Sequence, residues 1–240
     1  MKEMCCHFRS IELCPKKVPI FQSLSDEEII QIAKMTKHKR FHKGEALIHE
    51  GAKSDTLFII NRGRVKLSKL TLEGKEQILH LLTSGDFFCE LHVFNHDELS
   101  NFSAYALTDT DICMLTKSDM DHIMKISPVI CIKLLKTVTK RLAQTEKLAH
   151  NLATKDPEVR IAYLIIELCE KYGKENDEGI VVNLPITREE MANYVGVTRE
   201  TVSRKLSRFE ELGLIVSTGN KQILVKNVST LRGMVTMDNL

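Results

Sequence analysis

Short apolar runs separated by glycine turns fill the chain from about Phe41 to Leu115. The runs are rich in β-branched and aromatic residues, as in the stretch from Leu57 to Ile60. The glycine turns fall at Gly44, Gly51, Gly63, Gly74 and Gly85. Short strands broken by turn residues at this spacing are typical of an antiparallel β-barrel or jelly roll. We also expect a short amphipathic helix before the roll, from Ser25 to Met35, because Ser25 and Glu28 have the spacing of a capping box.

A long helical pattern follows, from Pro128 to about Ala153, and the proline suits a first helical turn. Its apolar positions recur at alternating spacings of four and three residues, which is the repeat of a coiled-coil seam. The seam consists of Cys131, Leu135, Val138, Leu142, Thr145, Ala149 and Leu152. So regular a seam predicts a helix that pairs with a copy of itself, and the alternative is a helix that packs on its own domain.

The segment from Leu184 to Ile215 carries the pattern of a helix-turn-helix. Thr187 is suited to cap a first short helix, Gly196 to supply the turn, and Thr198 to cap a second helix. Both helices have apolar inner positions, which are Met191, Ala192, Val195, Val202, Leu206 and Phe209. A small residue at Ala192 suits the close crossing of two helices.

Weaker patterns flank this motif on both sides. Asp156-Pro157 marks a boundary between the long helical pattern and the elements that precede the motif. Before the motif, the pattern predicts an amphipathic helix from Val159 to Lys171, a loop from Lys174 to Gly179 and a strand from Ile180 to Leu184. After the motif, it predicts a β-hairpin formed by Leu214 to Ser217 and Gln222 to Val225. Such a hairpin can act as a wing that lies on a phosphate backbone.

The outer face of the second helix of the motif is positively charged. Residues 199–208 hold three arginines and one lysine against one glutamate, so four positive charges minus one give +3, while the whole chain carries only +2. Recognition helices place such residues on base edges in the major groove, where arginine pairs with guanine and glutamate accepts from cytosine. The pattern therefore predicts sequence-specific DNA binding. The candidate DNA-contacting residues are Thr187, Arg188, Thr198, Arg199, Glu200, Thr201, Ser203, Arg204, Lys205 and Arg208.

Composition narrows the class of protein further. The chain has 240 residues, of which 43% are apolar and 28% charged, and this is ordinary globular composition. No apolar run approaches the roughly 20 residues of a membrane span, and the first residues lack the apolar region of a signal peptide. We therefore expect a cytoplasmic protein without a membrane partner.

With these features in this order, the chain resembles the family of the catabolite activator protein and the fumarate and nitrate reduction regulator, the CRP/FNR family. The most specific match is the segment Thr198-Arg-Glu-Thr-Val-Ser-Arg204. The resemblance implies a non-enzymatic transcription regulator with an α+β fold. Its parts would be a cysteine segment and β-roll (jelly-roll) sensor domain over 1–117, a long dimerisation helix over 118–153, and a winged helix-turn-helix domain over 154–240.

The resemblance also implies partners. A homodimer would bind palindromic double-stranded DNA and contact RNA polymerase. Arg199, Glu200, Ser203 and Arg204 stand at the positions that read bases in the family.

The effector positions depart from those of the family members that bind a cyclic nucleotide. Those members hold the phosphate with a Gly-Glu-Leu turn and, about ten residues later, an Arg-Ser or Arg-Thr pair. Here the matching positions are Cys89-Glu90-Leu91 and Ser100-Asn101, although Glu90 and Thr145 stand at family-like positions. A buried phosphate without its guanidinium is poorly compensated. The departure predicts that the effector is not a cyclic nucleotide, and we expect no resident cofactor.

The N-terminal cysteines resemble the FNR branch, whose oxygen-labile cluster uses three N-terminal cysteines and one on the roll. Cys5 and Cys14 match the outer ligands and Cys113 matches the roll ligand, but Phe8 stands at the middle position and Cys6 is an addition. Adjacent cysteines are awkward for two corners of one cluster. We therefore expect a dithiol-disulfide switch between the N-terminal group, most simply Cys5 or Cys6, and Cys113.

Two other sensing modes stay open. One is an iron-sulfur cluster on Cys5, Cys14 and Cys113, with Cys6 or His7 as the fourth ligand. The other is a site for a different small ligand. The remaining cysteines, Cys89, Cys131 and Cys169, are expected as small apolar residues on buried faces.

No other chemistry stands out in the sequence. His92 and His96 have a metal-like spacing, but we expect them in a roll loop as packing or solvent-facing residues, and no metal site is assigned. The rival of a different class is an enzyme or binding protein built on the β-roll. The chain has no P-loop, nucleophile elbow or His-Glu-x-x-His motif, so an enzyme is not expected.

Overall fold

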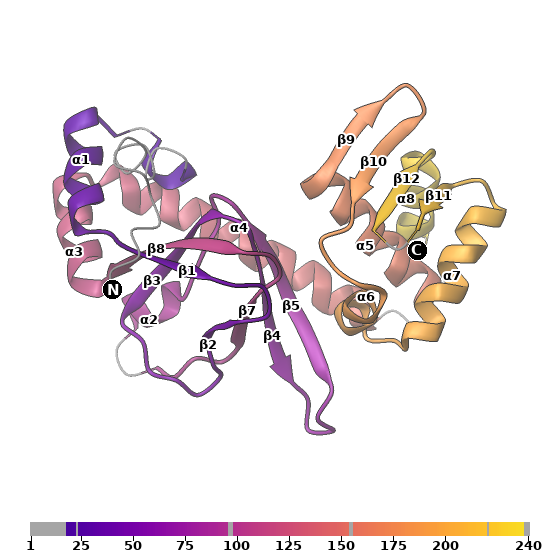
Figure 1. The fold of residues 1–240 in the computed structure, drawn as a ribbon, viewed down its shortest axis with the longest axis horizontal. Coiled ribbons are helices and arrows are strands. Elements are labelled where there is room, and N and C mark those ends of the chain that lie inside the picture. The colour runs from indigo at the N-terminus through magenta and orange to yellow at the C-terminus, as the bar shows by residue number, and fades with distance from the viewer. Residues whose placement is uncertain (1–17, 23, 96–97, 154–155, 220, 238–240) are drawn as a thin grey trace. The chain divides into compact units, whose positions relative to one another are not determined.

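The computed structural model describes residues 18–22, 24–95, 98–153, 156–219 and 221–237 (Figure 1). The chain divides into two compact units. The first comprises residues 1–69 and 79–142, and the second comprises residues 70–78 and 143–240. The three-part division expected above, with boundaries at 117 and 153, stays a prediction.

The first unit is a β-roll, as predicted. Its strands form two four-stranded sheets with the orders β1-β8-β3-β6 and β2-β7-β4-β5. The strands are β1 (Lys37–Phe41), β2 (Ala46–Ile48), β3 (Thr56–Arg62), β4 (Arg64–Leu70), β5 (Glu76–Thr83), β6 (Phe87–Phe88), β7 (Ser103–Ala106) and β8 (Thr110–Thr116). The helices are the short η2 (Pro19–Phe21), α1 (Asp26–Met35), α2 (Glu90–Phe94), α3 (Lys117–Ile126) and the first part of α4 (Val129–Ala153), which continues into the second unit. The capping box predicted for α1 is present, with the Ser25 N–H donating to Glu28 Oε2 over 2.8 Å.

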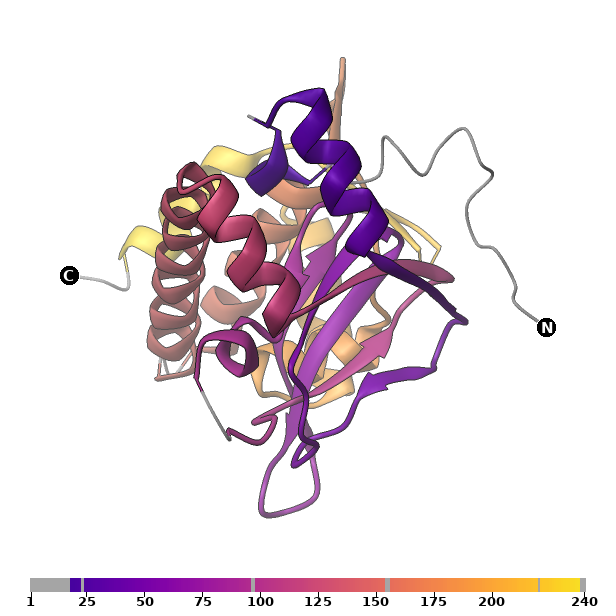
Figure 2. The same ribbon diagram turned by 90° about the vertical axis from the view of Figure 1, so that its left-hand side faces the viewer.

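Strand β3 supplies two apolar cores because its side chains alternate between the faces of the sheet. Leu57 and Ile59 pack with η2, α1, α3 and α4, and we call this cluster the helix-side core. Phe58 and Ile60 point the other way, into a cluster between the two sheets. Figure 2 shows α1 and α3 on the same side of the roll. Cys113 on β8 belongs to the helix-side core.

The second unit combines helices with a small antiparallel sheet of order β11-β12-β10-β9. Its elements are α5 (Pro157–Tyr172), β9 (Gly173–Asn176), β10 (Gly179–Asn183), α6 (Arg188–Val195), α7 (Arg199–Glu211), β11 (Ile215–Thr218), β12 (Gln222–Val225) and α8 (Val228–Met237). The predicted hairpin is therefore part of a larger sheet, because β12 also pairs with β10.

Two local predictions were wrong. Residues 174–176, expected in a loop, belong to β9, where Lys174 pairs with Val181 and Glu175 with Ile180. Their polar sequence has low strand propensity, and pairing with β10 overrides it. His92, expected in a roll loop, lies on the one-turn helix α2 and is buried.

Candidate nucleic-acid interface

The helix-turn-helix begins with the short helix α6, whose ends are both fixed by local hydrogen bonds. The Glu190 N–H donates to Thr187 Oγ1, and Glu190 Oε2 accepts from the Thr187 N–H over 2.9 Å, which forms a capping box. At the other end, Gly196 has φ +68° and its N–H donates to the Ala192 carbonyl. Only glycine adopts this left-handed conformation without strain, so the turn glycine predicted from the sequence is required there.

Helix α7 follows the turn and packs its apolar face inward. Thr198 caps it by accepting a hydrogen bond of 3.3 Å from the Thr201 N–H. Val202, Leu206 and Phe209 are buried, as predicted. Thr187 and Thr198 therefore cap the N-termini of the two helices, and the backbone N–H of Thr201 donates to the Thr198 cap.

The outer face of α7 is open to solvent. Its exposed residues include Arg199, Glu200, Ser203, Arg204 and Arg208. Within the described part of the chain, neither Arg199 nor Arg204 forms an ion pair within 4 Å. Hydrogen bonds from its own backbone N–H and from the Thr198 hydroxyl lower the pKa of the Glu200 carboxyl, and the charge of Arg199 lowers it further, so this side chain is an ionised acceptor. Arg208 makes an exposed ion pair of 3.2 Å with Glu211.

Two of the predicted DNA-contacting cations face the protein instead of solvent. Lys205 Nζ lies 2.6 Å from Glu158 Oε2 of α5, and both side chains are about three-quarters buried, with 24% and 25% exposure. Arg188 is half-buried beside Met191, and burial lowers the pKa of its guanidinium although Glu210 acts in the opposite direction. Lys205 therefore links α7 to α5, whereas Arg188 contacts a residue of its own helix.

Sequence reasoning missed Arg160, which contacts the turn of the motif from α5. Arg160 Nη1 donates to the carbonyls of Val195 over 2.9 Å and Gly196 over 3.3 Å. These groups are 35 and 36 residues apart along the chain, so no local spacing could indicate the contact. Glu158, the partner of Lys205, was missed for the same reason.

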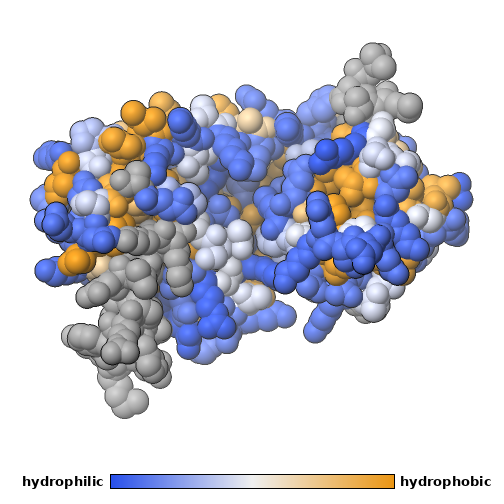
Figure 3. Space-filling model, turned by 90° about the horizontal axis from the view of Figure 1, so that it is seen from above, coloured by the Kyte–Doolittle hydropathy of each residue, from blue (hydrophilic) through white to orange (hydrophobic). Residues whose placement is uncertain are grey.

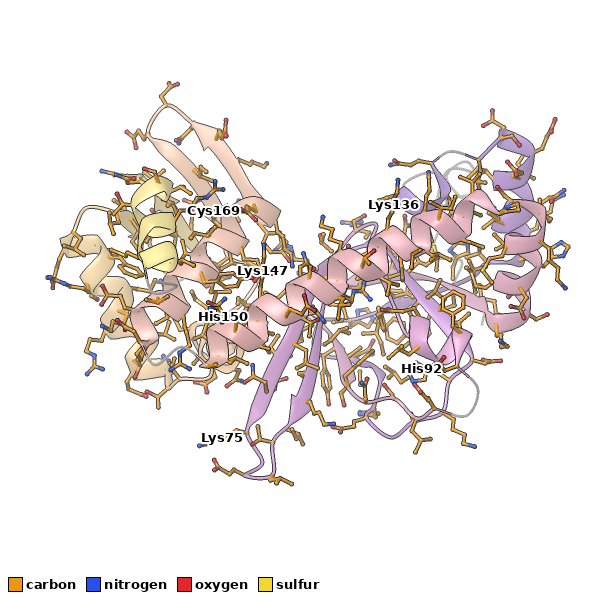
Figure 4. The ribbon with its side chains drawn as sticks, turned by 180° about the vertical axis from the view of Figure 1, so that it is seen from behind. Lys75, His92, Lys136, Lys147, His150 and Cys169 are labelled. Carbon is orange, nitrogen blue, oxygen red and sulfur yellow. The ribbon has the colours of Figure 1, made fainter. Side chains whose placement is uncertain are left out.

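Helix α4 carries two neighbouring apolar stripes. Ile130 and Leu134 are buried in the helix-side core. The predicted seam lies beside them and faces solvent in the single chain, where Leu135, Val138 and Leu142 are 66%, 37% and 56% exposed. Cys131, Thr145 and Ala149 of the seam are exposed as well, whereas Leu152 is half-buried. Figure 3 shows one face of the molecule, on which hydrophobic and hydrophilic residues both reach the surface. Figure 4 shows the molecule from behind, with Lys136 and Lys147 labelled along α4.

The family-like effector position of the roll is already occupied by an ion pair. Arg141 of α4 donates from Nη1 to Glu90 Oε1 and from Nη2 to the Phe87 carbonyl, each over 2.6 Å. Ser100 is buried, and its hydroxyl donates to the Phe102 carbonyl over 2.7 Å. No lysine or arginine occurs anywhere between residues 76 and 116.

The predicted redox residues are described only in part. Cys5, Cys6 and Cys14 lie outside the described residues, as does the alternative ligand His7. Cys113 is buried, and its Sγ lies 3.4 Å from Nδ1 of His38, its cross-strand partner on β1. Burial lowers the pKa of His38, and Asp111 acts in the opposite direction.

The other cysteines divide by exposure. Cys89 and Cys169 are buried as expected, and burial raises the pKa of both thiols, that of Cys169 to about 11. Cys131 is exposed in the single chain, contrary to that expectation, because it lies on the seam. Across the part of the chain that the structure describes, no group of three or more histidine, cysteine or acidic side chains could hold a metal ion.

The helices that can be described are all too short or too polar to cross a membrane.

Two family models match the chain: the cyclic nucleotide-binding domain over residues 38–127 and the Crp-like helix-turn-helix domain over residues 159–234. The cAMP-activated global transcriptional regulator CRP of Salmonella typhimurium is 32% identical over 192 residues, which cover 78% of this chain and 90% of that protein. The probable transcriptional regulator Flp of Lacticaseibacillus casei is 29% identical over 220 residues, covering 91% and 96%.

Solved structures support the same fold. A CooA variant from Carboxydothermus hydrogenoformans matches with a TM-score of 0.77 at 24% identity, covering 91% of this chain and 95% of the other. The c-di-GMP responsive global regulator CLP of Xanthomonas campestris matches with a TM-score of 0.72 at 21% identity, covering 85% and 100%.

Proposed function

Because the chain belongs to the CRP/FNR family of transcription regulators, we propose that it binds a palindromic DNA site as a homodimer and contacts RNA polymerase there. It is a DNA-binding transcription regulator with a cyclic nucleotide-binding-type domain and a helix-turn-helix. Family members of this kind typically act as dimers. The proposal covers the residues that contact bases, the surface through which two copies form a dimer, and the signal that the sensor domain receives.

Arg199, Glu200, Ser203 and Arg204 read bases in each half-site. The observation that carries this proposal is the exposure of all four on the outer face of a helix whose other side is buried. Arg199 and Arg204 are solvent-facing cations that form no ion pair within 4 Å in the described structure, so they can reach a base edge without first breaking a salt bridge. By contrast, Lys205 and Arg188 contribute to DNA binding by holding the fold, since each is engaged with protein groups.

A selection experiment tests this reading. The wild-type protein is used to enrich duplexes from a randomised pool, and binding to an enriched duplex is compared with binding to a scrambled duplex at physiological salt. A strong preference for an enriched sequence with two-fold symmetry supports the proposal. Equal affinity for both duplexes contradicts it, and is the outcome that the rival reading as a β-roll enzyme or binding protein requires.

The seam of α4 pairs with the seam of a second copy. Leucines that are more than half exposed along one helical stripe are unfavourable in water, and packing against an identical stripe removes them from it. A two-fold dimer also matches two half-sites on DNA.

Cyclic nucleotide is not the effector in this proposal. Glu90 is already paired with Arg141, and no cation from residues 76–116 is available to hold a phosphate. The opposing candidate is cAMP, which is favoured by relatives named as cAMP-activated regulators. Calorimetric titration with cAMP distinguishes the two, because saturable binding with one site per chain contradicts our proposal.

The signal is instead a change of redox state, sensed through a disulfide between one of the N-terminal cysteines and Cys113. Val18, Ile20 and Phe21 pack in the same helix-side core as Cys113, and Val18 follows Cys14 by only four residues. Cys5 and Cys6 precede Val18 by 13 and 12 residues, which is at most about 45 Å of extended chain, so the chain is long enough for either cysteine to reach Cys113. Oxidation would join the Cys113 sulfur to that of Cys5 or Cys6, releasing two protons and passing two electrons to a peroxide or a small disulfide.

Three measurements test the signal. Peptide mapping of the oxidised protein should recover a Cys113-linked N-terminal peptide, and Cys113→Ser should make DNA binding insensitive to oxidant. An anaerobic absorption spectrum with iron and sulfide analysis addresses the alternative cluster on Cys5, Cys14, Cys113 and Cys6 or His7. A cluster band with stoichiometric iron and sulfide would overturn the disulfide switch.

A further inference from the structure

We propose that Arg160 is a positioning residue for DNA reading, which sets the direction of α7 by holding the turn of the helix-turn-helix. This inference rests on the proposed role of α7. Arg160 lies on α5, outside the motif, and points at the two carbonyls with which α6 ends. Within the described residues, its hydrogen bonds go to Val195 and Gly196, which are not among the positions proposed to read DNA.

The two carbonyls need an external donor. The last carbonyls of a helix have no partner within it. Here the N–H groups of Gly196 and Val197 both donate to the Ala192 carbonyl, which leaves the Val195 and Gly196 carbonyls to be satisfied from elsewhere. Arg160 Nη1 donates to both, at 2.9 and 3.3 Å. A cation at this end also interacts favourably with the helix dipole.

The Arg160 guanidinium contacts the turn even though one of its own N–H groups has no hydrogen-bond partner in the described structure. Arg160 Nε is buried and has no hydrogen-bond partner in the described structure. An unpaired buried donor is costly, so the contact with the turn is made at the expense of another group of the same side chain. Such a cost is expected where the position of the side chain matters.

The turn is also packed against Leu152. Leu152 Cδ2 lies 3.2 Å and Arg160 Nη1 3.5 Å from the point that a β-carbon on Gly196 would occupy. Arg160 and Leu152 therefore both lie close to the turn at Gly196. On α5, Glu158 adds the ion pair to Lys205 of α7, so one turn of α5 contacts both the turn and the helix after it.

The geometry of α7 makes reading sensitive to this contact. Arg199 begins α7 only three residues after Gly196. Arg204 lies about 7.5 Å further along the helix, so a rotation of α7 by about 10° at its start moves Arg204 by more than 1 Å. The range of good hydrogen-bond lengths is only about 0.5 Å wide, so bidentate contacts to bases are lost while looser contacts to phosphate persist.

The test compares Arg160→Gln, Arg160→Lys and wild type in the full-length protein on the enriched and scrambled duplexes. The control is Arg232→Gln, which removes an exposed 3.1 Å ion pair with Glu170 away from the motif. We expect Arg160→Gln to weaken binding to the enriched duplex about tenfold or more, and binding to the scrambled duplex less than about twofold. Arg160→Lys should recover part of the loss because it keeps a cation that can donate to the carbonyls, and Arg232→Gln should change neither affinity.

Each other result overturns the inference. An equal loss on both duplexes, with a shallower salt dependence, means that Arg160 contacts phosphate itself. Unchanged affinity for the enriched duplex means that the turn does not need this residue, and a lowered melting temperature with unchanged affinities means that its role is only structural. If Arg160→Gln does not fold, the test uses Arg160→Lys, and the ratio of its affinities for the enriched and the scrambled duplex decides in the same way. Failure of the proposed function appears in the wild type as a lack of sequence preference, whereas failure of this inference appears only in the variants.

Discussion

Leu142→Glu should convert the protein from a dimer to a monomer. Leu142 is 56% exposed in the single chain, so dimer formation can still bury about half of its side chain. Full burial of a leucine contributes roughly 1.5–3 kcal/mol, so the remaining half contributes about 1 kcal/mol in each protomer. The glutamate also places an unpaired carboxylate in the interface twice, once from each copy, at a cost of several kcal/mol.

These terms add up to about 4 kcal/mol or more, which corresponds to a roughly thousandfold weaker dimer. Sedimentation velocity over a series of concentrations measures the change directly. Two controls separate the seam from general effects: Lys136→Glu alters the charge on the opposite face of α4, and Leu72→Glu makes the same substitution at a fully exposed leucine in the turn between β4 and β5. Both controls should stay dimeric. A Leu142→Glu protein that sediments as the wild-type dimer would show that α4 is not the interface.

Three further predictions follow from the same contacts. Copper-phenanthroline oxidation should link Cys131 to its copy across the seam, giving a dimer band on a non-reducing gel that Cys131→Ser removes; persistence of the band in that variant would place the link elsewhere. Arg199→Ala and Arg204→Ala should each cost about 1–3 kcal/mol on the enriched duplex and relax preference at one base pair, whereas Lys205→Ala should lower the melting temperature through loss of its pair with Glu158 and leave the base preference intact. Gly196→Ala should destabilise the second unit by about 1–2 kcal/mol in thermal unfolding, because φ is +68° and the new methyl group meets Leu152 at 3.2 Å; an unchanged melting temperature would contradict the strain.

The parts of the fold that were predictable have local signals. Thr187, Thr198 and Gly196 act on residues within one helical turn, so their spacing alone was enough to recognise the helix-turn-helix. The glycine turns of the roll are local in the same way. The seam of α4 was visible because its repeat runs along one helix.

The misses concern contacts between residues distant in sequence. Lys205 looked like a DNA contact because it follows Arg204 on a charged helix, and only the fold brings Glu158, 47 residues away, to its side chain. Arg160 was missed because its partners are backbone carbonyls, which have no sequence signature. Strand β9 was read as a loop because its pairing with β10, and not its own residues, makes it extended.

The neighbouring apolar stripes of α4 also constrain how genes of this kind can change in length. Ile130 and Leu134 serve the helix-side core, while Cys131 and Leu135, one residue further on, belong to the seam. Loss of a single residue turns every later side chain by about 100°, which moves later seam residues toward the core and later core residues away from both stripes. Seven added residues leave both stripes within about 20° of their original directions. We therefore expect insertions and deletions in this helix to survive only at lengths that complete nearly whole helical turns, such as about 7, 11 or 18 residues, although single substitutions at most exposed positions are harmless.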